Sequence, residues 1–317
     1  NTKNFIKNLK NNYTFETKPF FAVAVSGGPD SMCLIFLLNY VRKIYNCNLI
    51  ALIVNHNLRD NSKSEALKVK CFLKKYRIKS KVLEVNKIRV SKKTMNEARS
   101  NRYNLLTKYC QSKKILHLFV AHHNDDNLET FLYRKVSGSD FEGLQSMQKI
   151  SLINKTNILR PLLQYSKHEI IKFNNDNNIP YVQDPSNLNF RYTRPIIRNF
   201  IEETSSKNIK DLKNDYSVIR SNTKLYNKMI NEILIKNIFF INSNIVKINM
   251  INFNNLDNLI SEKLVKKIYQ FLYGEIRFLR SKKIQLLIDY TKSNDFNIFN
   301  LKGMIIKKDN DSLIFSK

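Results

Sequence analysis

The first 136 residues alternate between short apolar runs and longer segments whose apolar positions recur with helical spacing. The runs at 20–25, 49–54, 81–85 and 115–121 predict buried strands, and the segments 32–45, 62–76, 94–111 and 125–136 predict helices. Strands that are apolar on both faces and alternate with helices are typical of a parallel sheet covered on both sides. The pattern therefore predicts a Rossmann-like α/β fold with helices on both faces.

Polar clusters follow three of the predicted strands. They are Ser26–Ser31, His56–Arg59 and His122–Asp126. Ligands of parallel α/β sheets bind outside the carboxyl ends of the strands, which meet at one edge. We therefore expect these three clusters to form a single site.

The character of the sequence changes near residue 205. Asn and Lys become frequent there, and helical and strand patterns mix. We predict a catalytic domain at 1–208, followed at 209–317 by a smaller, mainly helical and basic domain.

The chain carries a large excess of positive charge. It has 54 Lys and Arg against 26 Asp and Glu, a net charge of +28. Such an excess indicates a polyanionic partner, for which nucleic acid, an anionic membrane and an acidic protein are candidates. A proteome that is basic throughout would give the same excess without any special partner.

The four cysteines, Cys33, Cys47, Cys71 and Cys110, are scattered and form no C-x-x-C pair. This spacing favours neither a disulfide framework nor a zinc or iron–sulfur site. The sequence contains no apolar run of membrane-spanning length, and its first residues lack the apolar core of a signal peptide. We therefore expect a cytoplasmic protein that does not enter the membrane.

The loop Ser26-Gly27-Gly28-Pro29-Asp30-Ser31 lies between a predicted strand and a predicted helix. Its glycines allow a sharp turn, and the free N–H groups at a helix start can bind phosphate. Asp30 or Ser31 can cap the helix. The loop is not a Walker A motif, because G-x-x-x-x-G-K-[ST] is absent. An ordinary strand-to-helix turn is the alternative.

This loop resembles that of the N-type ATP pyrophosphatases, which cleave ATP between the α and β phosphates. Further motifs resemble the tRNA(Ile)-lysidine synthetase family over about residues 20–200, and more weakly over 260–315. In chain order they are His56-Asn57-Leu58-Arg59, Ala98-Arg99, Arg102-Tyr103, Ala121 to Thr130, Arg160-Pro161-Leu162 and Asp184-Pro185-Ser186-Asn187.

The resemblance implies an ATP-dependent ligase. That family activates C2 of the first anticodon cytidine in a CAU-anticodon isoleucine tRNA by adenylation. Free lysine then displaces AMP, which changes codon reading from AUG to AUA. ATP, Mg²⁺, lysine and this tRNA are thus the expected cofactors and partners, and a homodimer is left open.

The resemblance also implies roles for individual residues. ATP would be bound by Ser26, Gly27, Gly28, Pro29, Asp30, Ser31 and His56, and Mg²⁺ by Asp30 and Asp125. Catalytic roles would fall to Asp30, Arg99, Arg102, Asp126 and Glu129. The tRNA would be bound by Arg191, Arg194, Arg198 and Arg280. Family members usually have Arg-Asn where this chain has Arg194-Pro195, and the proline removes a backbone donor and an amide side chain from that segment.

Asp126 and Glu129 are three residues apart at a predicted helix start, so they share one face. By resemblance they bind the lysine substrate, and a carboxylate there can accept the proton of the attacking amine. Acids that merely complement the helix dipole are the alternative. For Arg99 and Arg102 the alternative is a solvated basic face, and for His56 it is a capping or core histidine.

Two other functions fit parts of the pattern. A related tRNA thiolase would use the same loop, although such enzymes generally need cysteines that this sequence does not pair. A non-catalytic basic RNA-binding protein would explain the charge, but not the intact loop together with Asp126 and Glu129.

Overall fold

The computed structural model describes residues 2–55, 62–84, 95–137, 139, 143–182, 193–274 and 279–317. These residues form two compact units, 1–219 and 220–317. The division falls inside the helix α8 (Ser206–Asn237), and the boundary predicted at 208–209 lies near the start of the same helix. Each unit is described separately.

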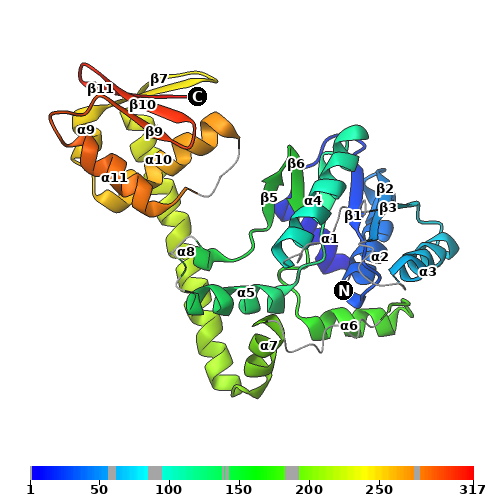
Figure 1. Ribbon diagram of the computed structural model, residues 1–317. Coiled ribbons are helices and arrows are strands. Elements are labelled where there is room, and N and C mark those ends of the chain that lie inside the picture. Colours follow the sequence, from blue (N-terminus) through cyan, green and yellow to red (C-terminus); the bar gives the residue numbers. More distant parts are fainter. Residues whose placement is uncertain are drawn as a thin grey trace. The chain divides into compact units, whose positions relative to one another are not determined.

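The first unit is built on a six-stranded sheet with the order β3-β2-β1-β4-β6-β5 (Figure 1). Strands β1 to β4 and β6 are parallel, and β5 is antiparallel to β6 at one edge. The strands are β1 (Phe20–Ala24), β2 (Asn48–Asn55), β3 (Ser80–Glu84), β4 (His117–Phe119), β5 (Ile150–Ile153) and β6 (Thr156–Leu159).

Helices cover both faces of this sheet. On one face they are α1 (Thr2–Asn12), α2 (Pro29–Ile44), α3 (Ser62–Lys75) and α6 (Lys167–Asp176), and on the other α4 (Met95–Ser112). Helices α5 (Asn124–Val136) and α7 (Thr193–Glu203) pack against each other in a separate small core. The central strand β1 shows how the faces form. Phe21 and Val23 belong to the core shared with α1, α2, α3 and α6, whereas Ala22 belongs to the core shared with α4. Successive side chains of a strand point to opposite faces, so an uninterrupted apolar run serves both cores.

The predicted α/β fold is confirmed. Each strand and helix expected in the first 136 residues is present, with ends that shift by only a few residues. The helix α1 and the hairpin β5–β6 were not predicted. No helix in the described part of the chain is both long and apolar enough to span a membrane.

The second unit combines helices with an antiparallel sheet of order β7-β8-β11-β10-β9. Its elements after α8 are β7 (Ile238–Ile241), β8 (Ile245–Asn249), α9 (Met250–Asn254), α10 (Asn258–Tyr273), α11 (Ser281–Thr291), β9 (Ile298–Leu301), β10 (Met304–Asp309) and β11 (Ser312–Ser316). Helices contribute more residues than strands, as expected, but the sheet itself was not predicted. A separate core lies between α10, α11 and this sheet.

Candidate active site

The loop after β1 is held in shape by the Ser31 hydroxyl. This buried oxygen accepts the N–H groups of Ser26 and Gly27, each at 3.2 Å, and donates to the Gly28 carbonyl at 3.0 Å. Helix α2 then begins at Pro29, whose ring fixes a helical φ and has no N–H to leave unpaired. The N–H groups of Asp30 and Ser31 lie in the first turn, where no earlier helical carbonyl is available to them. Free N–H groups at a helix start are a common binding site for phosphate.

Gly27 is required by both conformation and space. Its φ of +90° lies in the region that side chains rarely adopt, and a Cβ built there would be 2.4 Å from Cγ2 of Val69. Its carbonyl accepts the N–H of Val182 at 2.9 Å. Gly27 thus brings the loop into direct contact with α3.

Asp30 is paired with a lysine that sequence reasoning did not single out. Nζ of Lys167 lies 2.6 and 2.8 Å from the two carboxylate oxygens of Asp30. The backbone N–H of Lys167 donates to Oδ2 of Asp125 at 2.7 Å. Asp125 therefore satisfies one of the free N–H groups at the start of α6, and Lys167 connects two carboxylates expected to hold a metal.

The buried His123 lies among the carboxylates of this site. Its ring nitrogens lie 3.9 Å from Asp30, 3.7 Å from Asp125 and 3.5 Å from Asp126. Its backbone N–H donates to Oδ2 of Asp126 at 3.0 Å, and this hydrogen bond caps the start of α5. The polar clusters after β1 and β4 thus meet at the carboxyl edge of the sheet, as expected from the order of the strands.

Glu129 is the most buried carboxylate of the site, with a side chain that is 6% exposed. Nε of Arg198 donates to it at 2.5 Å, and Nη2 of the same guanidinium lies 3.8 Å from Asp126. Burial alone would lower the pKa of Arg198, but the hydrogen bond and charge of Glu129, with Asp126 and Asp30, raise it. Asp126 and Glu129 share one face of α5, and the guanidinium group of Arg198 lies on that face.

The packing of α7 against α5 places Arg198 there. Leu128, Phe131 and Tyr216 form a small core with Ile197 and Ile201 of α7. Arg198 follows Ile197 directly and therefore projects at the edge of this contact. It was expected to bind tRNA phosphates, and in the described structure its partners are Glu129 and Asp126.

Arg99 and Arg102 lie on α4, with guanidinium carbons 5.4 and 5.7 Å from the ring centroid of Tyr103. The charge of Arg99 contributes to a lowered pKa of Arg160, for which burial is the main cause. Arg160 itself donates to the Gln148 carbonyl and to the Ser151 hydroxyl, both at 2.9 Å. This motif arginine therefore fastens β5 to β6.

The remaining predicted residues divide into two groups. His56 and Arg191 lie outside the described residues, as does the Asp184–Asn187 motif, and so does the side chain of Arg194. Arg280 lies in the second unit, where it is exposed at the N-cap position of α11 and makes no side-chain capping hydrogen bond.

Sequence reasoning missed two residues that contact the loop, Lys167 and Asn174, and only Lys167 had a detectable signal. Ser166 and Glu169 form a capping box at the start of α6, a spacing that predicts a helix start and places Lys167 in its first turn. The other residue, the fully buried Asn174, donates to the Pro29 carbonyl at 2.9 Å and ties α6 to the loop. A single asparagine in an Asn-rich chain gives no such signal.

A central parallel strand that ends in a glycine–serine loop and a free helix N-terminus defines an α/β nucleotide-binding domain. A PP-loop domain model matches residues 1–204. The chain belongs to the PP-loop family and, within it, to the family of tRNA(Ile)-lysidine synthases.

Two relatives illustrate the second assignment. The tRNA(Ile)-lysidine synthase of Rickettsia bellii (strain OSU 85-389) is 30% identical over 299 residues, which are 92% of this chain and 68% of the relative. That of Wolbachia sp. subsp. Brugia malayi (strain TRS) is 38% identical over 190 residues, which are 59% of this chain. The chain spans only 44% of this Wolbachia relative.

The fold is shared with a solved structure of a different protein. A U34-tRNA thiolase from Methanococcus maripaludis, solved with its 4Fe-4S cluster, superposes with a TM-score of 0.58 at 21% identity. The likeness covers 70% of this chain and 78% of that one. It confirms the fold.

Proposed function

We propose that this chain ligates lysine to C2 of the first anticodon cytidine of a CAU-anticodon isoleucine tRNA. In this scheme ATP adenylates the base and releases pyrophosphate, and lysine then displaces AMP. The product reads AUA in place of AUG. The reaction would take place in the cytoplasm, where ATP, lysine and tRNA are all present.

The meeting of two sites at one sheet edge carries this proposal. The loop, with the N–H groups at the start of α2 and the cation of Lys167, suits a pyrophosphate. The Asp126–Glu129 face suits a cationic amine. His123, which lies within 4 Å of both Asp30 and Asp126, connects the two. A reaction that first cleaves ATP and then attacks with an amine needs these two sites side by side.

The chemistry of each step matches the residues that would carry it. The C2 oxygen of cytosine leaves poorly, and adenylation converts it into a good leaving group. The amine of lysine must lose its proton to attack, and in this scheme the buried carboxylate of Glu129 would accept it. Arg198 occupies that carboxylate in the structure, so the substrate ammonium group would replace or share its contact.

Asp30 and Asp125 are the oxygen donors proposed for Mg²⁺. Carboxylates together with substrate phosphates are the usual ligands of this ion, which would neutralise phosphate charge. Among the described residues no group of three or more His, Cys, Asp or Glu side chains is arranged to hold a metal by itself. Both oxygens of Asp30 accept Nζ of Lys167, so Mg²⁺ would share that carboxylate with the lysine, and ATP phosphates would complete its ligands.

Mass analysis of the anticodon nucleoside tests the proposal. The protein is incubated with CAU-anticodon tRNA, ATP, Mg²⁺ and lysine, and the nucleoside is then isolated. Lysidine, formed together with lysine-dependent AMP and pyrophosphate, is the expected product. Thiocytidine would instead assign the chain to the thiolases. An unmodified cytidine would favour a non-catalytic RNA-binding protein.

A further inference from the structure

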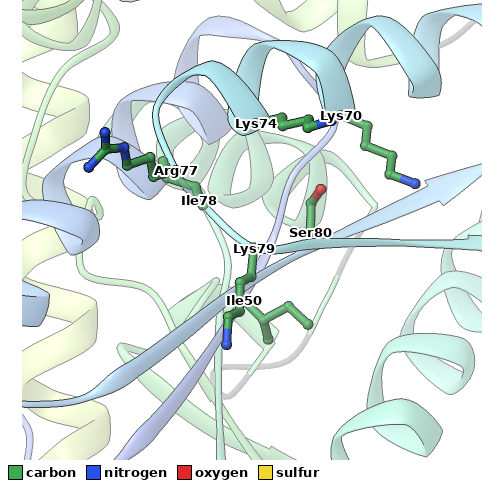
Figure 2. Close-up of a pocket in the computed structure, with 7 residues that line it drawn as sticks. All are labelled: Ile50, Lys70, Lys74, Arg77, Ile78, Lys79 and Ser80. Atoms are coloured by element: carbon green, nitrogen blue, oxygen red, sulfur yellow. The ribbon is translucent and has the colours of Figure 1, made fainter.

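Two adjoining cavities open at the amino edge of the six-stranded sheet, opposite the loop. One, of about 540 Å³, is lined by Lys70, Lys74, Arg77 and Lys79 and reaches Ser80, the first residue of β3 (Figure 2). The other has a similar volume and is lined by residues that include the starts of β1 and β2. Lys79 lines both cavities, so they form a continuous depression.

The charges around this depression are of one sign. Lys70, Lys74, Arg77 and Lys79 are all exposed, and Arg42 lines the second cavity. No carboxylate is among the described residues that line either cavity. We call these five cations the amino-edge surface. Within the described part of the chain none of them forms an ion pair with an acidic side chain. Lys70 and Lys74 are also four apart on α3, and like charges at this spacing destabilise a helix slightly.

The arrangement of the cations suits an extended anion better than a small one. Figure 2 shows the side chains of Lys70 and Arg77 pointing in different directions from the cavity rim, with Lys79 on a third side. The carbonyls at the end of α3 are already occupied, because Leu73 accepts the N–H of Ile78 and Lys74 accepts that of Arg77. The negative end of this helix therefore has fewer free carbonyls to repel an anion.

We propose that the amino-edge surface binds the phosphate backbone of RNA, at a part of the tRNA away from the reacting base. Separate cations around a shallow depression match successive phosphates of a backbone. The candidate active site lies at the other end of β1, a five-residue strand that spans roughly 15 Å. The identity of the RNA rests on the proposed function, whereas the surface itself rests on its charge and shape.

Salt-dependent binding separates this surface from the general basicity of the chain. The double variant Lys70→Ser/Lys74→Ser removes two surface cations. Its matched control, Lys3→Ser/Lys7→Ser, removes two exposed lysines that are also four residues apart, on α1. Affinity for full-length CAU-anticodon tRNA is measured from low to high salt, and circular dichroism checks that both variants fold.

We expect the slope of log affinity against log salt to become shallower by about 1.5–2 for the first variant and to stay unchanged for the control. Binding of the isolated anticodon stem–loop should be the same for both. Equal slopes in the two variants would overturn the proposal. It would also be overturned if the first variant lost as much affinity for the isolated stem–loop as for full-length tRNA. The proposal would also be overturned if the first variant kept its affinity for tRNA and lost affinity only for vesicles of anionic phospholipid.

The two proposals fail in different ways. If the unaltered protein forms no lysidine but the slopes still differ, the surface stands and the proposed function falls. If lysidine forms and the two slopes are equal, the proposed function stands and the proposal for the amino-edge surface falls.

Discussion

Lys167 and Asp30 stand 137 positions apart in the chain and form a two-pronged ion pair, with Nζ at 2.6 and 2.8 Å from the carboxylate oxygens. The pair joins the start of α6 to the phosphate loop. With this lysine in place, Asp30 has its charge balanced before any nucleotide arrives. The lysine in turn lies beside the expected pyrophosphate position.

Replacing Lys167 by Met should therefore slow AMP formation. A cation next to departing pyrophosphate stabilises the charge that develops there, and loss of one such donor costs about 100-fold or more in turnover. The exposed Lys172 on the same helix provides a matched control, because Lys172→Met removes an equal charge away from the loop. Release of AMP from ATP, measured with tRNA and lysine present, decides the matter. Equal rates in the two variants would show that Lys167 only holds α6 in place.

Gly27 should tolerate no side chain, whereas its neighbour should. Gly27→Ala combines a positive φ with a Cβ at 2.4 Å from Val69, and we expect a loss of roughly 2–4 kcal/mol in the free energy of unfolding. Gly28 has a φ of −71° and its nearest atom would be 3.6 Å from a Cβ, so Gly28→Ala should unfold like the parent. Urea denaturation of both variants tests this, and similar midpoints would contradict the strain.

The strands of the first unit were predictable because burial on both faces leaves an unmistakable pattern. Phe20–Ala24 is apolar throughout, since Phe21 and Ala22 serve opposite cores. The hairpin β5–β6 lacked this signal: side chains along β5 alternate between exposed and half-buried, so its short run resembles a surface segment. The sheet of the second unit escaped for a similar reason: β7 has no buried residue and half of β10 is exposed, so neither strand gives an uninterrupted buried run.

The site was predictable where it depended on strand ends and unpredictable where it depended on docking. Loop and α5 residues follow β1 and β4, so topology alone brings Asp30 and His123 together. The contacts of Lys167 and Arg198 instead require α6 and α7 to pack in one place. In a chain with 54 Lys and Arg, no single basic residue stands out.

The cysteines should react in two groups. Burial raises the pKa of Cys33 and Cys110 to about 12 and that of Cys47 to about 11, so few of these thiols are ionised at pH 8. Cys71 is exposed. A thiol-reactive disulfide reagent should therefore label one cysteine quickly in the folded protein and four after denaturation. Rapid labelling of two or more would reopen a sulfur-transfer role.

Glu129 should serve the second half of the reaction and not the first. It lies buried on the face that suits an amine, while the phosphate loop is held by Ser31, Asn174 and Lys167. Glu129→Gln keeps the size of the side chain but removes its charge. We expect lysine transfer to fall about 10²–10³-fold, because the amine loses its proton acceptor, while adenylated tRNA still forms.

Two further variants make this expectation decisive. Asp30→Asn should stop adenylation itself, since it alters the loop. Thr130→Val, next to Glu129 on α5, removes only a hydroxyl that donates to the Asp126 carbonyl at 2.7 Å and should change neither step. Rapid quenching with labelled ATP separates adenylated tRNA from the lysine product. If Glu129→Gln loses adenylation first, the carboxylate serves ATP or its metal, and the lysine must bind elsewhere on the carboxyl edge.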